Sequence, residues 1–179
     1  MTDPESPYYR QAMELYAAGF PLHEQRRPEE QIQAMKDPAF HCDALVESGT
    51  FIGLLFYWEA VGVTYVEHFA VVEALRSSGA GSRALAAFCP AHAPVVLEID
   101  PPEDAVSTRR KGFYQRLGFA ENSYAHRRPP YRTGFAPHPL VVMSWPEALS
   151  PEAYSTFSRM LSHRVMRYAQ VGISQLAVT

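Results

Sequence analysis

The chain has 179 residues, of which 47% are hydrophobic and 20% charged, and its net charge at neutral pH is −3. This length suits one domain with a full hydrophobic core. The small negative charge gives no electrostatic reason to expect a nucleic acid or an anionic membrane as partner, and no apolar run approaches the roughly 20 residues that span a bilayer. The first residues lack the basic and apolar regions of a secretory signal. Two cysteines, Cys42 and Cys89, are too few for a disulfide framework. We therefore expect the protein to reside in the reducing cytoplasm.

The first part of the chain predicts two helices joined by a polar loop. Ser6-Pro7 pairs a capping hydroxyl with a proline suited to the first helical position, and Gly19 suits a helix end. A second short helix is expected over residues 28–36. The loop between the helices, residues 20–27, reads F-P-L-H-E-Q-R-R.

The middle of the chain predicts a meander of three strands, followed by helices and further strands. Ser48-Gly49 lies between two apolar runs, which is typical of a compact hairpin. The expected elements are strands at 42–47, 50–59 and 63–72, a helix at 79–89, a strand at 95–99, a helix at 103–118, a strand from 119 and a strand at 139–144. This order predicts an α+β fold with a mixed, mostly antiparallel central sheet flanked by helices.

A C-terminal helix is expected at about 150–168, because Ser150-Pro151-Glu152 is a typical helix start. One face of this helix carries an apolar stripe of Tyr154, Phe157, Leu161, Val165 and Tyr168. We expect the stripe to pack on its own domain, with a homodimer contact as the alternative. No linker or repeat divides the chain, so we expect a single domain over residues 1–179.

A turn with two glycines separates the strand at 63–72 from the helix that follows. It reads R-S-S-G-A-G from Arg76 to Gly81. Free backbone N–H groups at a helix N-terminus bind phosphate, and glycine lets the main chain approach the phosphate closely. Ser78 or Ser82 would add hydroxyl donors. Taken alone, the two glycines are more typical of a plain tight turn.

A dinucleotide site is an alternative for this turn. Gly79-x-Gly81-x-x-Ala84 fits the dinucleotide fingerprint, and Asp100 lies near the distance expected for the acid that binds the ribose. However, that fingerprint places its first glycine directly after a strand, whereas several residues separate Val72 from the first glycine here. The preceding meander is also unlike the start of a doubly wound sheet, so we favour a different phosphate-binding family.

Two segments in the right order resemble the GNAT superfamily of N-acetyltransferases. Arg76-x-x-Gly79-x-Gly81 resembles the R/Q-x-x-G-x-G/A signature of that family, and the preceding E-H-F-A-V-V resembles its pantetheine-binding strand. Y-Q-R-L-G-F, which begins at Tyr114, resembles the family's Y-x-x-x-G-F segment. The resemblance covers roughly residues 40–144.

The resemblance implies an acyltransferase that moves an acetyl group from acetyl-CoA directly to an amine of a small molecule or a peptide. Acetyl-CoA would be a co-substrate, and no metal would be needed. The implied coenzyme contacts are Phe69, Val71, Arg76, Ser77, Ser78, Gly79, Ala80, Gly81, Ser82 and Tyr114. Ser107 departs from the family, because many members carry an asparagine there, seven residues before the tyrosine.

Tyr114 is the candidate acid, because the resemblance implies that the family's tyrosine protonates the departing thiolate. A half-buried core tyrosine beside Phe113 is the alternative. The resemblance also implies that the backbone N–H of Val71 binds the thioester carbonyl, with a local distortion of the strand there.

The candidate base is Glu67. An alkylamine has a pKa near ~10.4, so some group or water must accept its proton. Strand alternation predicts one face with Tyr65, Glu67, Phe69 and Val71. A carboxylate in an apolar strand costs free energy unless it is paired, so an arginine ion pair is an equal alternative for Glu67. Glu98 is a second candidate base, and His68 is expected to point away from Glu67.

The acceptor pocket is expected to form from the loop at 20–27 and from the irregular segment at 122–139, which is rich in histidine, arginine and aromatic residues. Two other functions stay open. A non-catalytic acyl-CoA-binding module would tolerate loss of Tyr114 and Glu67, whereas a dinucleotide-dependent oxidoreductase would bind NAD and not coenzyme A. Cys89-Pro-Ala-His92 has no second ligand pair nearby in sequence, so no metal site is predicted.

Overall fold

The structure is a computed structural model that describes residues 6–170. The first five of the seven N-terminal residues that argue against a secretory signal lie outside this range. The helices are α1 (Tyr9–Gly19), α2 (Pro28–Ala34), α3 (Ala80–Ala91), α4 (Ala105–Arg116) and α5 (Pro151–His163), with short 3-10 helices at Leu22–Glu24, Glu73–Leu75 and Val165–Tyr168. The strands are β1 (Phe40–Glu47), β2 (Thr50–Ala60), β3 (Val63–Val71), β4 (Val95–Ile99), β5 (Ala120–Glu121), β6 (His126–Arg128) and β7 (His138–Trp145).

The strands form one sheet of seven strands in the order β1-β2-β3-β4-β7-β5, with β6 paired to β7. The β3–β4 pair is parallel, and the other described pairs are antiparallel. This arrangement confirms the predicted α+β fold with a mixed, mostly antiparallel sheet. It does not fit the dinucleotide alternative, because that site needs a doubly wound parallel sheet.

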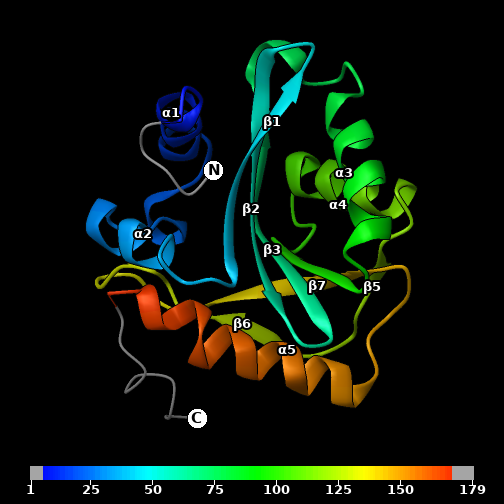
Figure 1. The fold of residues 1–179 in the computed structure, drawn as a ribbon. Coiled ribbons are helices and arrows are strands. Elements are labelled where there is room, and N and C mark those ends of the chain that lie inside the picture. The colour runs from blue at the N-terminus through cyan, green and yellow to red at the C-terminus, as the bar shows by residue number, and fades with distance from the viewer. Residues whose placement is uncertain (1–5, 171–179) are drawn as a thin grey trace.

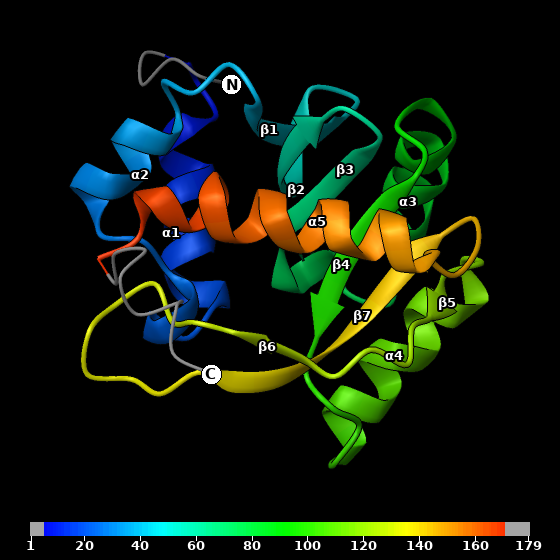
Figure 2. The same ribbon diagram turned by 90° about the horizontal axis from the view of Figure 1, so that it is seen from below.

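Helices cover both faces of the sheet (Figures 1 and 2). One core lies under α1, α2 and α5 and includes Phe56, Trp58 and Phe157, whereas the other lies under α3 and α4 and includes Leu55 and Leu85. Leu55 and Phe56 belong to different cores because successive strand side chains point to opposite faces. None of the described helices is long and apolar enough to cross a membrane.

The stripe on the last helix packs on its own domain, as predicted. Phe157, Leu161 and Val165 are buried, and Tyr154 and Tyr168 pack against the same core. α5 ends at His163, and a 3-10 helix carries the last two positions of the stripe. The homodimer stays a prediction, and this stripe does not provide a surface for it.

The segment after α4 differs from its prediction. β5 has only two residues, and β6 has no counterpart among the predicted strands. β6 reads H-R-R, so it lacks the apolar alternation by which strands are found in a sequence. Its inward side chains, His126 and Arg128, are buried because both bind the carboxylate of Glu98.

A β-bulge in β3 interrupts the pairing with β2. His68 pairs with Phe56 and Val66 pairs with Tyr57, so Glu67 has no residue opposite it. A bulge of this kind turns two successive side chains toward one face of the sheet and reverses the alternation beyond it.

The predicted faces of β3 are therefore wrong beyond the bulge. Glu67 and His68 both point toward the core under α1, where Glu67 meets Trp58 and His68 packs on Phe20. Phe69 packs in the other core, on the opposite face from Glu67. A bulge depends on the partner strand, and alternation within one strand cannot reveal it.

Candidate active site

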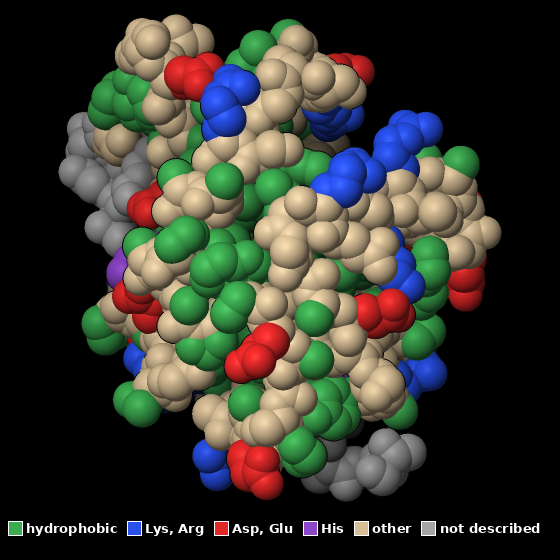
Figure 3. All heavy atoms as spheres, turned by 90° about the vertical axis from the view of Figure 1, so that its right-hand side faces the viewer, with side chains coloured by type: hydrophobic (Ala, Val, Ile, Leu, Met, Phe, Trp, Pro, Cys, Tyr) green, Lys and Arg blue, Asp and Glu red, His purple; other side chains and the backbone are tan. Residues whose placement is uncertain are grey.

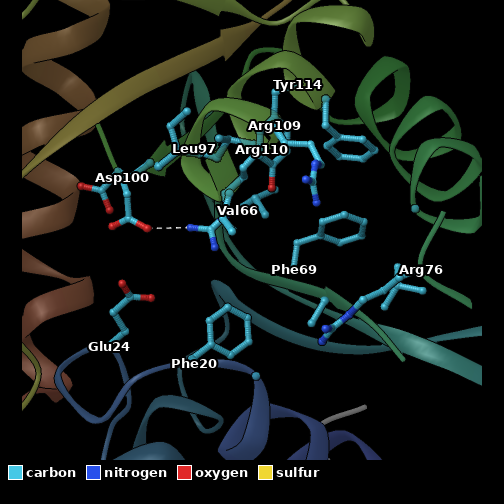
Figure 4. Close-up of a pocket in the computed structure, with 18 of the residues that line it drawn as sticks. Phe20, Glu24, Val66, Phe69, Arg76, Leu97, Asp100, Arg109, Arg110 and Tyr114 are labelled. Carbon is cyan, nitrogen blue, oxygen red and sulfur yellow. Dashed lines mark hydrogen bonds and ion pairs between the residues drawn. The ribbon is translucent and has the colours of Figure 1, made fainter. Parts of the chain in front are cut away.

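A cleft of about 860 Å³ lies where β3 and β4 separate. The two strands pair only where Thr64–Val66 lies beside Val95–Leu97. Beyond this point Phe69 on β3 and Ile99 on β4 line the cleft. The α1–α2 loop forms one wall and α4 the other, so Phe20 and Glu24 face Arg109 and Tyr114 across the opening (Figure 4).

The bulge decides which backbone N–H groups of β3 face this opening. The Val72 N–H donates to the Ile52 carbonyl on β2 at 3.0 Å. Because alternate N–H groups along a strand point to opposite edges, the Val71 N–H points away from β2 and toward the gap beside β4. The distortion itself lies at Glu67 rather than at Val71, where it was expected.

The glycine turn forms the N-terminus of α3 at one end of the cleft. Gly79 is the N-cap residue, with a φ of 82°, and offers no side chain to accept from the first helical N–H groups. Gly81 allows a close approach of α3 to β3, because a Cβ built there would lie 3.4 Å from Phe69 Cζ and Val71 Cγ2. The turn therefore presents donor N–H groups and a partial positive charge to the cleft.

Arginines surround this end of the cleft. Arg76, Arg109 and Arg116 line it, and none of them has a carboxylate partner among residues 6–170. Arg110 is instead paired with Asp100 at 2.7 Å. Basic side chains lie along the upper part of the face that carries α3 and α4 (Figure 3). A helix N-terminus with unpaired arginines is suited to bind phosphate groups.

Tyr114 lies on α4 and reaches the cleft from the side opposite the α1–α2 loop (Figure 4). Its ring packs edge-on against Phe113 and Phe119, with centroids 5.1 and 5.5 Å away. Burial raises the pKa of Tyr114 to about 12. The hydroxyl therefore keeps its proton at neutral pH and is available as a donor.

The Ser107 side chain caps the N-terminus of α4 and does not line the cleft. Asp104 caps α4 by accepting from the N–H groups of Val106 and Ser107 at 2.7 and 2.8 Å. The Ser107 hydroxyl accepts from the Asp104 N–H at 3.1 Å, which completes a capping box.

Glu67 lies at the bulge in a fully buried ion pair with Arg26. Arg26 donates to the two carboxylate oxygens at 2.8 and 2.6 Å, and Trp58 Nε1 donates at 3.1 Å. The Tyr131 hydroxyl donates as well. Burial alone would raise the pKa of Glu67, but Arg26 outweighs this effect and holds the pKa well below its usual range. Of the two roles left open by the sequence, these contacts favour the ion pair.

Glu98 is held in a similar way. Tyr65 donates to it at 2.6 Å, Arg128 donates at 3.2 Å, and His126 is a further hydrogen-bond partner. Burial alone would raise the pKa of Glu98, but the positive charge of Arg128 has the larger effect, so the pKa is lowered. The sequence indicated that buried glutamates need partners, but it could not identify Arg26, Arg128 or Tyr131 as those partners.

The two segments expected to form the acceptor pocket do meet at the cleft. Phe20, His23 and Glu24 line it from the α1–α2 loop, and Arg128 lines it from β6. The loop is anchored to the later segment, because the Tyr131 N–H donates to the His23 carbonyl at 2.9 Å.

Most of the predicted site residues line the cleft: Glu67, Phe69, Val71, Arg76, Ser77, Gly79, Gly81, Ser82 and Tyr114. Ser78 and Ala80 do not. The Ser78 hydroxyl donates to the Leu75 carbonyl at 2.8 Å and accepts from the Ala80 N–H at 3.3 Å. Ser78 and Ala80 therefore stabilise the turn through hydrogen bonds within it.

Solved structures with the same architecture extend these observations. A protein from Bacteroides thetaiotaomicron assigned to the GNAT acetyltransferase family is 31% identical, with a TM-score of 0.83 over 89% of this chain and 92% of that one. Arabidopsis thaliana Naa50, in complex with the bisubstrate analogue CoA-Ac-MVNAL, is 16% identical, with a TM-score of 0.55 over 78% and 93% of the two chains. An aminoglycoside 6'-N-acetyltransferase in complex with coenzyme A is also 16% identical, with a TM-score of 0.53 over 79% and 92%.

The sequence itself matches a family model. Residues 9–119 match the model of the acetyltransferase (GNAT) family. No curated protein sequence matches the chain. The matched range covers the α1–α2 loop, β3, the glycine turn and Tyr114, which form most of the cleft, whereas Arg128 and Leu140 line it from outside that range. The chain belongs to the GNAT family of acetyltransferases.

Proposed function

We propose that this protein transfers an acetyl group from acetyl-CoA to an amine by direct attack. The observation that carries the proposal is the single cleft that joins an anion-binding helix end to the gap between β3 and β4. The first part suits the phosphates of coenzyme A, and the second suits an extended arm that ends in a thioester. The complex of Naa50 with an analogue that joins coenzyme A to a peptide supports an amine acceptor.

Each part of the cleft has a role in this proposal. The N–H groups of Gly79, Gly81 and Ser82 and the side chains of Arg76 and Arg109 would hold the phosphates. The Val71 N–H would donate to the thioester carbonyl and stabilise the charge that develops on its oxygen. Tyr114 would give its proton to the departing thiolate. Acetyl-CoA supplies the activated acyl group.

Isothermal titration of the purified protein with acetyl-CoA, with NAD in parallel, tests the proposal. We expect micromolar binding of acetyl-CoA and none of NAD. Release of free thiol with a panel of amines then separates the enzyme from a non-catalytic module that only binds the coenzyme. Binding of NAD alone, or of neither compound, would contradict the proposal.

Tyr114→Phe is expected to lower kcat by roughly 100-fold, the lower end of what a general acid supplies, since a thiolate is already a fair leaving group. The dissociation constant of acetyl-CoA should stay nearly unchanged, because the ring and its packing remain. Tyr57→Phe is the matched control, since Tyr57 is buried in the same core but does not line the cleft. Unchanged turnover in Tyr114→Phe would remove Tyr114 from the mechanism.

A further inference from the structure

One carboxylate in the cleft differs from the others. Glu24, Glu67, Glu98 and Asp100 line the cleft. The last three each have an arginine partner, within 2.6 to 3.2 Å. The Glu24 carboxylate forms no ion pair with an arginine or lysine in the part of the chain that the structure describes; it lies 3.7 Å from His23 Nε2, and Arg128 acts on it only from a longer distance. Its side chain is only 19% exposed. A half-buried carboxylate without a cationic partner is costly unless a ligand supplies one.

The backbone around Glu24 is held by hydrogen bonds, although its carboxylate has no arginine or lysine ion pair among the described residues. The Glu24 N–H donates to the Pro21 carbonyl at 2.9 Å, and the Glu24 carbonyl is 2.8 Å from His68 Nε2. The neighbouring His23 carbonyl accepts from the Tyr131 N–H at 2.9 Å. Figure 4 shows the Glu24 side chain at the end of the cleft near Asp100, away from Arg76. A fixed backbone that presents a carboxylate without an arginine or lysine partner is what a preorganised site for a cation requires.

Two histidines complete the group. The ligand atoms of His23, Glu24 and His138 all lie within 4.8 Å of one another. Both ring nitrogens of His138 are buried without a hydrogen-bond partner among the described residues. Burial and the nearby Arg128 lower the pKa of His138, so the ring is neutral and keeps an acceptor nitrogen. Buried polar atoms without protein partners commonly bind water or a ligand.

We propose that Glu24, with His23 beside it in the cleft and His138 behind them, binds the ammonium group of the acceptor and takes its first proton, so that the substrate is an amine that is positively charged at neutral pH. This inference rests on the proposed acetyl transfer. It excludes acceptors that carry a carboxylate next to the amine, because Glu24 would repel them.

The proton balance of the reaction follows from this assignment. The alkylammonium gives one proton to Glu24, which passes it to solvent through the histidines or water. The free amine attacks the thioester carbon, so that a C–N bond forms and the C–S bond breaks. The thiolate takes a proton from Tyr114, and the second proton of the nitrogen restores Tyr114. The products are the acetamide, coenzyme A and one released proton.

Glu24→Gln keeps the shape of the side chain and removes its charge, so it tests the proposal directly. The amine panel contains phenylethylamine as a cationic amine, aniline as an amine that is neutral at pH 7, and glutamate as an amine with an adjacent carboxylate. We expect wild type to prefer phenylethylamine, and Glu24→Gln to lower kcat/KM for it by roughly 10²-fold or more. The loss should be much smaller for aniline, which has no proton to give before attack. Glu14→Gln is the control, because Glu14 is exposed on α1, outside the cleft.

The pH profile gives a second readout that a merely structural role would not move. The other titratable or charged groups around this site are His23, His138, Arg128 and Asp100. Without Glu24 the reaction must start from free amine in solution. We therefore expect kcat/KM of Glu24→Gln for phenylethylamine to rise about tenfold per pH unit up to the pKa of the free amine, which is roughly 10 for an amine of this class. The wild-type profile should be flatter.

Titration with acetyl-CoA distinguishes the two proposals. If wild type does not bind acetyl-CoA, the proposed function fails. If wild type and Glu24→Gln bind it equally but have the same kcat/KM for phenylethylamine, this inference is wrong. It is also wrong if wild type binds acetyl-CoA and acetylates none of the panel. Micromolar binding of Zn²⁺ to wild type that is lost in both Glu24→Gln and His138→Ala would identify a metal site instead and overturn it.

Discussion

Gly79→Glu is expected to weaken the binding of coenzyme A by about 10³-fold. The new carboxylate would lie at the N-cap of α3, where the proposed site binds a phosphate. Two like charges about 4 Å apart repel by about 4 kcal/mol at the effective dielectric of a protein surface, which corresponds to roughly 10³-fold in affinity. Isothermal titration with coenzyme A measures this loss.

The variant also places a non-glycine residue at a φ of 82°, which costs on the order of 1–2 kcal/mol of stability. Gly62→Glu is the matched control, because Gly62 has the same φ of 82° with no atom within 4 Å of a built Cβ, and it lies outside the cleft. We expect both variants to lose similar stability in thermal unfolding, with coenzyme binding lost only in Gly79→Glu. Equal affinity in Gly79→Glu and wild type would refute the phosphate cradle.

Glu67→Gln is expected to reduce the free energy of unfolding by about 3–5 kcal/mol. The substitution leaves the buried Arg26 guanidinium without a counterion, and breaking one side of a buried pair has this cost. Stabilities of 5–15 kcal/mol are usual for a domain, so the loss is a large fraction of the total. Urea unfolding at pH 7 measures it.

Two further variants make the Glu67 test decisive. Glu47 is also bonded to an arginine, accepting three hydrogen bonds from Arg83, but this pair is exposed, so Glu47→Gln should cost no more than about 1 kcal/mol. The double variant Arg26→Met/Glu67→Gln removes both buried charges and should recover much of the loss, even if the single variant is too unstable to purify. A Glu67→Gln loss no larger than that of Glu47→Gln would contradict a stabilising role for the buried pair.

The contribution of the pair depends on pH in a predictable direction. Burial would raise the pKa of Glu67, but Arg26 outweighs it and lowers the folded-state pKa below the unfolded value of ~4.3. The stabilisation is therefore fully present above that unfolded value and is lost as the pH falls through the folded-state pKa. The difference between wild type and Glu67→Gln should be constant near neutral pH and shrink in strong acid.

Local signals in the sequence predicted most of the fold because caps and periodicity act over a few residues. Gly19 ends α1, the hairpin turn at Ser48-Gly49 joins β1 to β2, and the glycine turn leads into α3. β6 escaped prediction because its inward side chains are polar, and they become buried only by meeting Glu98. A strand of this kind has no apolar pattern to find.

By itself the sequence determined the order of the elements, the glycine turn and its arginine, and the place of Tyr114 after them, and these carry the resemblance to the GNAT family. The tertiary structure alone decided the bulge at Glu67, the pairing of Glu67 with Arg26 and of Glu98 with Arg128, and the lack of an arginine partner for Glu24. The physical reason is the separation along the chain of the residues that interact. A turn or cap is set by neighbouring residues, whereas the charge state and orientation of a buried carboxylate depend on partners brought to it from distant parts of the chain.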